Sequence, residues 1–217
     1  MMVKSPILID YKKVESRKCY HFIKRLSDII LSACGVVILS PVMGLIAYKI
    51  KKEDGGPIIY KQVRVGKNGQ SFEMYKFRSM VPNADQLLEK LKDQNEVEGA
   101  MFKMKHDPRI TQIGHFIRKH SLDELPQLVN VFKGDMSLVG PRPPLPTEVN
   151  QYTTYDKQRL YVRPGCTGLW QATERNNVGF DKMVELDLKY IRHSSLSYDF
   201  WIILKTIMII IKPNNSY

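Results

Sequence analysis

A long apolar stretch near the N-terminus constrains this chain more than any other feature. Residues 26–50 read LSDIILSACGVVILSPVMGLIAYKI. As one straight helix, these 25 residues would reach about 37 Å, more than the roughly 30 Å of a bilayer's hydrocarbon core. The stretch therefore predicts a helix long enough to enter a membrane.

Pro41 divides this predicted helix. Proline has no backbone donor, so it frees the carbonyl of Val37 and predicts a break at Ser40-Pro41. The two arms would reach roughly 21 Å and 15 Å, too short to span a bilayer alone. Positive charge prefers the cytoplasmic side, and basic residues flank both ends of the stretch: Lys24, Arg25, Lys49, Lys51 and Lys52. We therefore expect a re-entrant helix; a Pro-kinked spanning helix is the alternative.

The charge balance favours an anionic partner. The chain of 217 residues carries 33 Lys and Arg against 22 Asp and Glu, a net charge of +11. Residues 1–25 predict a basic tail that is attracted to an anionic inner leaflet of a membrane. We see no nucleic-acid-binding motif, so no nucleic-acid partner is expected. The three cysteines show neither metal nor disulfide spacing, which fits a cytosol-facing protein.

Two adjacent carboxylates, Asp123 and Glu124, precede an apolar helical pattern over residues 122–132. Pro126 is tolerated only in the first turn of that helix, which places the pair at its N-terminus. Unpaired N–H groups there favour an ionised carboxylate, able to act as a nucleophile or to bind a cation. The alternative is a capping box, with Ser121 at the N-cap and Glu124 reaching back.

Two arginines are candidates for phosphate binding. Arg142 lies between Pro141 and Pro143, which fix the backbone, and its planar fork suits phosphate bidentately. For that segment alone, a rigid surface loop is the alternative. Arg78 follows the second of two predicted strands, 58–65 and 71–77, which residues 66–69 join as a hairpin.

Five motifs together resemble the bacterial sugar transferases, the monotopic polyprenyl-phosphate phosphoglycosyl transferases. Several long motifs in the same order make the resemblance specific, and it runs from about Lys24 to about Lys212. The motifs are KRLSDIILS (24–32), YKFRSM (75–80), SLDELPQLVNVFKGDMSLVGPRP (121–143), RPGCTGLWQ (163–171) and VELDLKYI (184–191).

The resemblance implies transfer of a sugar phosphate from a UDP-sugar to polyprenyl (undecaprenyl) phosphate. The products would be a polyprenyl-diphosphate sugar and UMP, in the first membrane step of exopolysaccharide, capsule or glycan assembly. Asp123 would form a covalent aspartyl phospho-sugar intermediate, with Glu124 positioning it or binding metal. Mg²⁺ is the expected cofactor, held by Asp123 and Glu124, because it suits carboxylate and phosphate oxygens.

Four arginines are the predicted phosphate or substrate ligands: Arg78, Arg118, Arg142 and Arg175. Where the family carries small residues and a Ser-Gly before an arginine, this chain reads Ala172-Thr-Glu-Arg175. That departure leaves the sugar and the role of Arg175 open. Two other functions remain: a membrane-attached module that binds anionic lipid or nucleic acid without catalysis, and an ordinary glycosyltransferase that releases UDP.

The expected fold is α+β and mostly helical, in a monotopic protein of the bacterial cytoplasmic membrane with its catalytic domain on the cytosolic face. Further helices are expected at 82–98 and 147–161. The oligomeric state is open, a homodimer included. The expected parts are a basic tail (1–25), a re-entrant membrane helix (26–50), a catalytic domain with a small β-hairpin (51–195) and a C-terminal interfacial helix (196–217).

Overall fold

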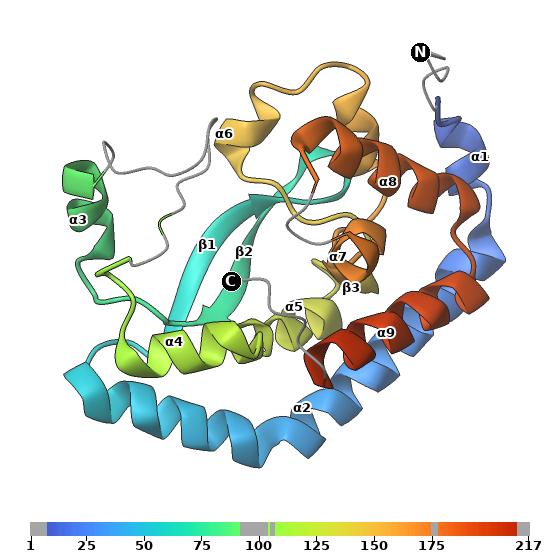
Figure 1. The fold of residues 1–217 in the computed structure, drawn as a ribbon. Helices are drawn as coiled ribbons and strands as arrows, with labels where there is room; N and C mark the ends of the chain where they lie inside the picture. The colour runs from blue at the N-terminus through green and yellow to red at the C-terminus, as the bar shows by residue number, and fades with distance from the viewer. Residues whose placement is uncertain (1–7, 92–103, 105–106, 175–177, 212–217) are drawn as a thin grey trace.

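The computed structural model describes residues 8–91, 104, 107–174 and 178–211, and within them the chain is mostly helical (Figure 1). The helices are α1 (Tyr11–Glu15), α2 (Lys18–Asp54), α3 (Ala84–Leu91), α4 (Gln112–Lys119), α5 (Gln127–Lys133), α6 (Pro146–Val149), α7 (Leu169–Thr173), α8 (Phe180–His193) and α9 (Leu196–Ile211). The 3₁₀ turns are η1 (Lys67–Gly69), η3 (Leu122–Glu124) and η4 (Asp156–Tyr161). The strands are β1 (Ile59–Val65), β2 (Ser71–Phe77), β3 (Ser137–Val139) and β4 (Gly165–Thr167).

The predicted apolar helix is part of α2, which has 37 residues and begins at Lys18, inside the expected basic tail. Figure 1 shows α2 as two arms that meet at an angle along the lower edge of the view. The helix is continuous through Pro41, so the predicted break is a bend within one helix. The Ser40 hydroxyl donates to the Val37 carbonyl at 2.8 Å, which satisfies the acceptor that Pro41 leaves without its usual donor.

One face of α2 leaves large apolar side chains at the surface. By length and composition, α2 is able to cross a membrane. Helix α9 also exposes apolar side chains, and α4 and α5 add Phe116 and Phe132. Exposed apolar residues of this size in such number mark an interaction surface. On α2 and α9 they include Leu26, Ile30, Leu31, Val37, Ile38, Leu45, Phe200, Leu204, Ile207 and Met208.

The opposite face of α2 packs on the rest of the chain. Ile46 and Ile50 are buried in one cluster with Phe77 of β2 and Ile117 of α4. Nearer the start of α2, the Arg25 guanidinium donates to the carbonyls of Val131 and Phe132, two acceptors at the end of α5 that have no partner within that helix. Helix α2 therefore serves as a platform for α4, α5 and β2.

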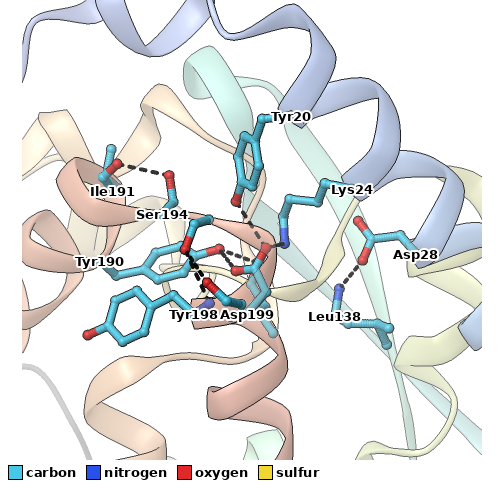
Figure 2. A network of polar contacts seen from close by, with 12 residues as sticks. Tyr20, Lys24, Asp28, Leu138, Tyr190, Ile191, Ser194, Tyr198 and Asp199 are labelled. Carbon is cyan, nitrogen blue, oxygen red and sulfur yellow. Dashed lines mark hydrogen bonds and ion pairs between the residues drawn. The ribbon is translucent and has the colours of Figure 1, made fainter.

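A buried polar network ties the start of α2 to α8 and α9 (Figure 2). Asp199 of α9 is only 7% exposed. Its carboxylate pairs with the Lys24 ammonium at 3.0 Å and accepts hydrogen bonds from the Tyr20 and Tyr190 hydroxyls at 3.0 and 2.6 Å. Because a buried charge is costly unless it is paired and hydrogen-bonded, this network fixes α9 against α2.

The predicted hairpin is confirmed: β1 pairs antiparallel with β2, with Ile59 opposite Phe77 and Val65 opposite Ser71. A second pairing was not predicted, in which β3 runs parallel to β4. The predicted helix 82–98 is described only over α3, and its remainder lies outside the described residues. The predicted helix 147–161 is wrong, because the chain there forms α6 and η4. Between them, the Thr153 hydroxyl and backbone N–H both donate to the Asp156 carboxylate and form a turn.

Candidate active site

The carboxylate pair lies in η3, a short turn between α4 and α5. Ser121 has a left-handed backbone, with φ of 54°, and makes no side-chain capping bond. The predicted capping box is therefore wrong, because an N-cap residue needs an extended backbone. Helix α5 begins only at Gln127, after Pro126. Asp123 and Glu124 thus precede the helix in a turn of their own, rather than occupying its first turn.

Apolar side chains on either side of the pair anchor η3. Leu122 and Leu125 pack against the cluster that contains Ile46 and Ile50 of α2. The next turn approaches α2 as well, since a Cβ added at Gly35 would lie 3.1 Å from a Leu128 methyl carbon. The two carboxylates are therefore held at a fixed position above the long apolar helix.

Asp123 has an unusual protonation equilibrium. Burial raises the pKa of its carboxyl group to about 6, and the neighbouring Glu124 carboxylate acts in the same direction. The positive charges of Lys76 and Arg118 oppose this rise in the pKa. A partly desolvated carboxylate that remains ionised near neutral pH is suited to act as a nucleophile.

Glu124 is held by a lysine from the hairpin. The Lys76 ammonium of β2 lies 2.8 Å from the Glu124 carboxylate. Lys76 lies within the YKFRSM motif, but the sequence alone predicts no role for it. The contact joins two segments 48 residues apart in the sequence. The local sequence pattern around either residue does not predict it.

A small cavity of about 20 Å³ opens beside this ion pair. The Arg142 side chain is half-buried there and makes no hydrogen bond or ion pair with any described residue. The residues around the cavity that matter here are Arg64, Lys76, Glu124, Arg142, Cys166 and Gln171. An uncommitted guanidinium beside a lysine favours an anionic ligand with several acceptor oxygens.

Arg64 of β1 is a second arginine in this cavity, and sequence reasoning missed it. It is 6% exposed, and it donates to the Pro143 carbonyl at 2.9 Å and to the Gln62 side chain. Burial first, and then the nearby charge of Arg142, lower the pKa of Arg64 to about 10. Because the two guanidinium groups repel each other across the cavity, an anionic ligand bound there would be stabilised. The only sequence signal was an arginine within a strand pattern, which is usually a surface residue.

Close backbone contact between β3 and β4 sets the loop that carries Arg142. The Gly140 N–H donates to the Thr167 carbonyl, and the Gly165 N–H donates to the Pro141 carbonyl, both at 2.9 Å. A Cβ at Gly165 would collide with the backbone nitrogen of Gly140. The glycines of the SLVGPRP and RPGCTG motifs thus permit an approach that no side chain allows.

We expect Gly165→Ala to destabilise the protein by about 2 kcal/mol and to lower turnover, because the added methyl group must push the Arg142 loop away from β4. Gly179→Ala is the matched control, since nothing lies within 4 Å of a Cβ at Gly179. Thermal unfolding in detergent measures the difference. Equal melting temperatures for the two variants would contradict this account of the loop.

The structure places the other predicted arginines differently. Arg78 is buried and engaged elsewhere: its guanidinium binds the Asp54 carboxylate and donates to the Pro57 carbonyl at 2.6 Å. Arg118, in the last turn of α4, is close enough to Asp123 to lower its pKa. Arg175 lies outside the described residues. Asp123, Glu124, Arg118 and Arg142 therefore belong to one region, and Arg78 points towards the end of α2.

The donor set fits a magnesium ion that has few protein ligands. Among the described residues, no group of three His, Cys, Asp or Glu side chains could hold a metal ion. Asp123 and Glu124 supply two adjacent carboxylates. Mg²⁺ commonly takes only one or two carboxylates and completes its shell with water and substrate phosphate oxygens. The pair therefore fits a metal that arrives with a phosphorylated substrate.

These features mark a candidate site whose cationic and acidic side chains suit a phosphorylated ligand, beside a long apolar helix. Residues 19–213 match the bacterial sugar transferase family. The chain therefore belongs to the bacterial sugar transferases.

Curated relatives agree with this assignment. The chain is 49% identical over 189 residues to the galactosyl transferase CpsE of Streptococcus agalactiae, covering 87% of this chain and 42% of CpsE. It is 44% identical over 206 residues to an undecaprenyl-phosphate galactose phosphotransferase of Salmonella typhimurium, covering 93% and 43%. It is 39% identical over 217 residues to the exopolysaccharide production protein ExoY of Rhizobium meliloti, covering 98% and 96%. The chain thus spans less than half of the first two relatives and nearly all of the third.

Proposed function

We propose that this protein transfers a sugar phosphate from a UDP-sugar to undecaprenyl phosphate and releases UMP. The observation that carries the proposal is the Glu124–Lys76 ion pair beside the uncommitted Arg142 guanidinium in one cavity, with Asp123 next to Glu124 in η3. The name of the Salmonella relative supports the acceptor and the type of reaction. That of ExoY supports a place in exopolysaccharide production.

In the proposed mechanism, an Asp123 carboxylate oxygen attacks the phosphorus atom nearest the sugar. The bond from that phosphorus to the bridging oxygen breaks, UMP leaves with the bond's electrons, and an aspartyl phospho-sugar forms. An oxygen of undecaprenyl phosphate then attacks the same phosphorus. The Asp123 carboxylate is regenerated, and the product is undecaprenyl-diphosphate sugar.

The surrounding residues hold the charges of this reaction. Lys76 orients Glu124 through the 2.8 Å contact, and Arg142 binds the diphosphate. Arg64 holds the Arg142 loop through the Pro143 carbonyl and adds positive charge. Asp123 and Glu124 would hold Mg²⁺, which would supply further neutralisation of the phosphate oxygens.

The test is nucleotide release by detergent-solubilised protein with undecaprenyl phosphate, Mg²⁺ and a panel of UDP-sugars. UDP-galactose comes first, because the names of CpsE and of the Salmonella relative both specify galactose. Repeated turnover of UMP that requires the lipid acceptor and stops with EDTA supports the proposal, and the covalent step predicts one equivalent of UMP per enzyme without the acceptor. UDP in place of UMP would mean an ordinary glycosyltransferase, and no release with any donor would favour a binding module.

We further propose that α2 enters the cytoplasmic membrane and returns to the cytosolic face, where the catalytic residues lie. The arm that follows Ser40 has 14 residues, or about 21 Å as helix, too short to cross a bilayer. Exposed apolar residues on α9, together with Phe116 and Phe132, lie at the boundary between this membrane and the cytosol. This position agrees with the prediction of a C-terminal interfacial helix over residues 196–217.

We expect both ends of α2 to react with a membrane-impermeant thiol reagent from the cytosolic side alone. Cys19 reports on the first end, and a Lys52→Cys substitution in a Cys19→Ser background reports on the second. Cys166 is replaced by serine in both proteins, and Cys34, inside the apolar stretch, should stay unlabelled in vesicles. Labelling of the two ends from opposite faces of inverted and right-side-out vesicles would establish a spanning helix.

A further inference from the structure

A second cavity, of about 40 Å³, lies between the start of α2, the first residues of β3 and residues 161–163. It shares no lining residue with the cavity around Glu124. Its volume exceeds the 10–15 Å³ that one water needs and admits a small tetrahedral anion. Figure 2 shows two of its walls: Tyr20, Lys24 and Asp28 on α2, and Tyr190 with Ser194 on the opposite side.

The cavity is lined by donors that have no acceptor among the described residues. The side chain of Lys67, half-buried in η1, makes no hydrogen bond or ion pair within them. Arg163 uses only its Nε atom, which donates to the Gly134 carbonyl at 2.9 Å. The Tyr161 hydroxyl makes no hydrogen bond there, and the buried Ser137 hydroxyl is also unpaired. Because buried polar groups are normally hydrogen-bonded, the unpaired Ser137 hydroxyl indicates a ligand, and the half-buried Lys67 and Tyr161 and the exposed Arg163 supply further donors beside it.

The acidic residues on the walls do not satisfy these donors. The Asp28 carboxylate accepts from the Leu138 N–H at 3.0 Å, and Glu15, at the rim, accepts from Tyr11. Lys24 is already paired with Asp199. The Lys67 ammonium therefore remains unpaired among the described residues, and the exposed Arg163 guanidinium keeps its two terminal nitrogens available. Two cations and two hydroxyls around a small cavity suit the oxygens of a phosphate group.

The position of the cavity identifies the source of that phosphate. Its lining on α2 runs from Tyr20 to Asp28, the stretch of the helix that also carries Phe22 and Leu26, which are 71% and 47% exposed. If α2 enters the membrane, as proposed above, this is the depth of the lipid headgroups, and acyl chains can follow the apolar face. Basic pockets at that depth attract anionic headgroups.

We propose that this cavity binds the phosphate of an anionic membrane phospholipid through Lys67, Arg163, Tyr161 and Ser137. The inference rests on the proposed membrane attachment of α2 and not on the sugar transfer. The bound lipid would hold α2 against β3 and η1, and would set the height of the catalytic cavity above the membrane.

The experiment is thermal unfolding of the detergent-solubilised protein with dioctanoyl phosphatidylglycerol, dioctanoyl phosphatidylcholine or inorganic phosphate. We expect phosphatidylglycerol to raise the melting temperature of the wild type by a few degrees, and the other two to raise it by less than half as much. Lys67→Gln and Tyr161→Phe should each lose at least half of the phosphatidylglycerol shift. Lys67→Arg should keep it. Lys182→Gln, an exposed lysine on α8, removes the same charge and should also keep it.

Four outcomes would overturn the proposal. An unchanged shift in both Lys67→Gln and Tyr161→Phe would mean that the lipid binds elsewhere, and equal loss in Lys182→Gln would mean a general charge effect. An equal shift with inorganic phosphate would mean a free phosphate site. A shift with short-chain polyprenyl phosphate larger than that with phosphatidylglycerol would assign the cavity to the acceptor substrate. Because UMP release at saturating substrate is measured separately, failure of the sugar-transfer proposal remains distinguishable from failure of this one.

Discussion

Asp123→Asn is expected to lower UMP release at least about 1,000-fold, because the amide oxygen is a poor nucleophile and cannot form the aspartyl phospho-sugar. The measurement is single-turnover and steady-state UMP release with the best donor of the panel. Asp181→Asn, on an exposed position of α8, is the matched control and should keep full activity. An Asp123→Asn protein that turned over at the wild-type rate would eliminate the covalent mechanism.

The same substitution is expected to stabilise the fold at neutral pH. Burial raises the pKa of Asp123 from 3.8 to about 6, so the folded state binds its proton more tightly than the unfolded state does. The free energy of unfolding therefore falls as the pH rises from about 4 to about 6, because the buried carboxyl group becomes charged. It stays at the lower value above this range. Neutral asparagine removes a cost of about 1 to 3 kcal/mol.

Melting temperatures of wild type and Asp123→Asn, in EDTA, test this expectation. The variant should melt several degrees higher at pH 8, and the two proteins should converge near pH 4. A variant that is inactive and more stable cannot owe its inactivity to unfolding. Equal melting temperatures across the whole range would mean that Asp123 is not appreciably desolvated in the folded protein.

The sequence could predict the elements whose signals are local. Alternating side chains and the turn at Gly66–Gly69 predicted the hairpin, and the length and apolarity of residues 26–50 predicted the core of α2. The capping box failed because its pattern is equally compatible with the left-handed Ser121, whose conformation ends α4 before η3 begins. The helix over 147–161 failed because Thr153 and Asp156 hydrogen-bond locally instead of continuing a helix.

Contacts between distant segments could not be predicted in the same way. Lys76 meets Glu124, and Arg64 meets the Pro143 carbonyl, only because the hairpin folds over η3 and the Arg142 loop. No period or spacing encodes those meetings. The pairing of β3 with β4 depends on the close approach of Gly140 and Gly165. Glycines at these positions permit the approach, but the sequence does not indicate that the two segments meet.

Arg78→Met is expected to destabilise the protein by about 2 kcal/mol, because it leaves the Pro57 carbonyl without its donor and the solvent-exposed Asp54 carboxylate without its partner. The hydrogen bonds from Arg78 lower the pKa of Asp54 to about 2, because they favour its charged form. Asp54 is the last residue of α2, and Lys76 lies two residues before Arg78 on β2. The pair therefore connects the end of the apolar helix to the strand that orients Glu124.

A double-mutant cycle separates this structural role from phosphate binding. If the pair is a clamp, Asp54→Asn should reproduce most of the loss in stability, and the double variant should lose little more than either single variant. Lys61→Met is the control, because its ion pair with Glu73 is exposed and should contribute under about 1 kcal/mol. If Arg78 instead contacts substrate phosphate, its removal should raise the KM for the UDP-sugar, while the melting temperature and the effect of Asp54→Asn stay unchanged. If the pair is a clamp, Arg78→Lys should keep the positive charge without restoring the stability of the wild type. The reason is that an ammonium group cannot bind the Asp54 carboxylate bidentately and also donate to the Pro57 carbonyl.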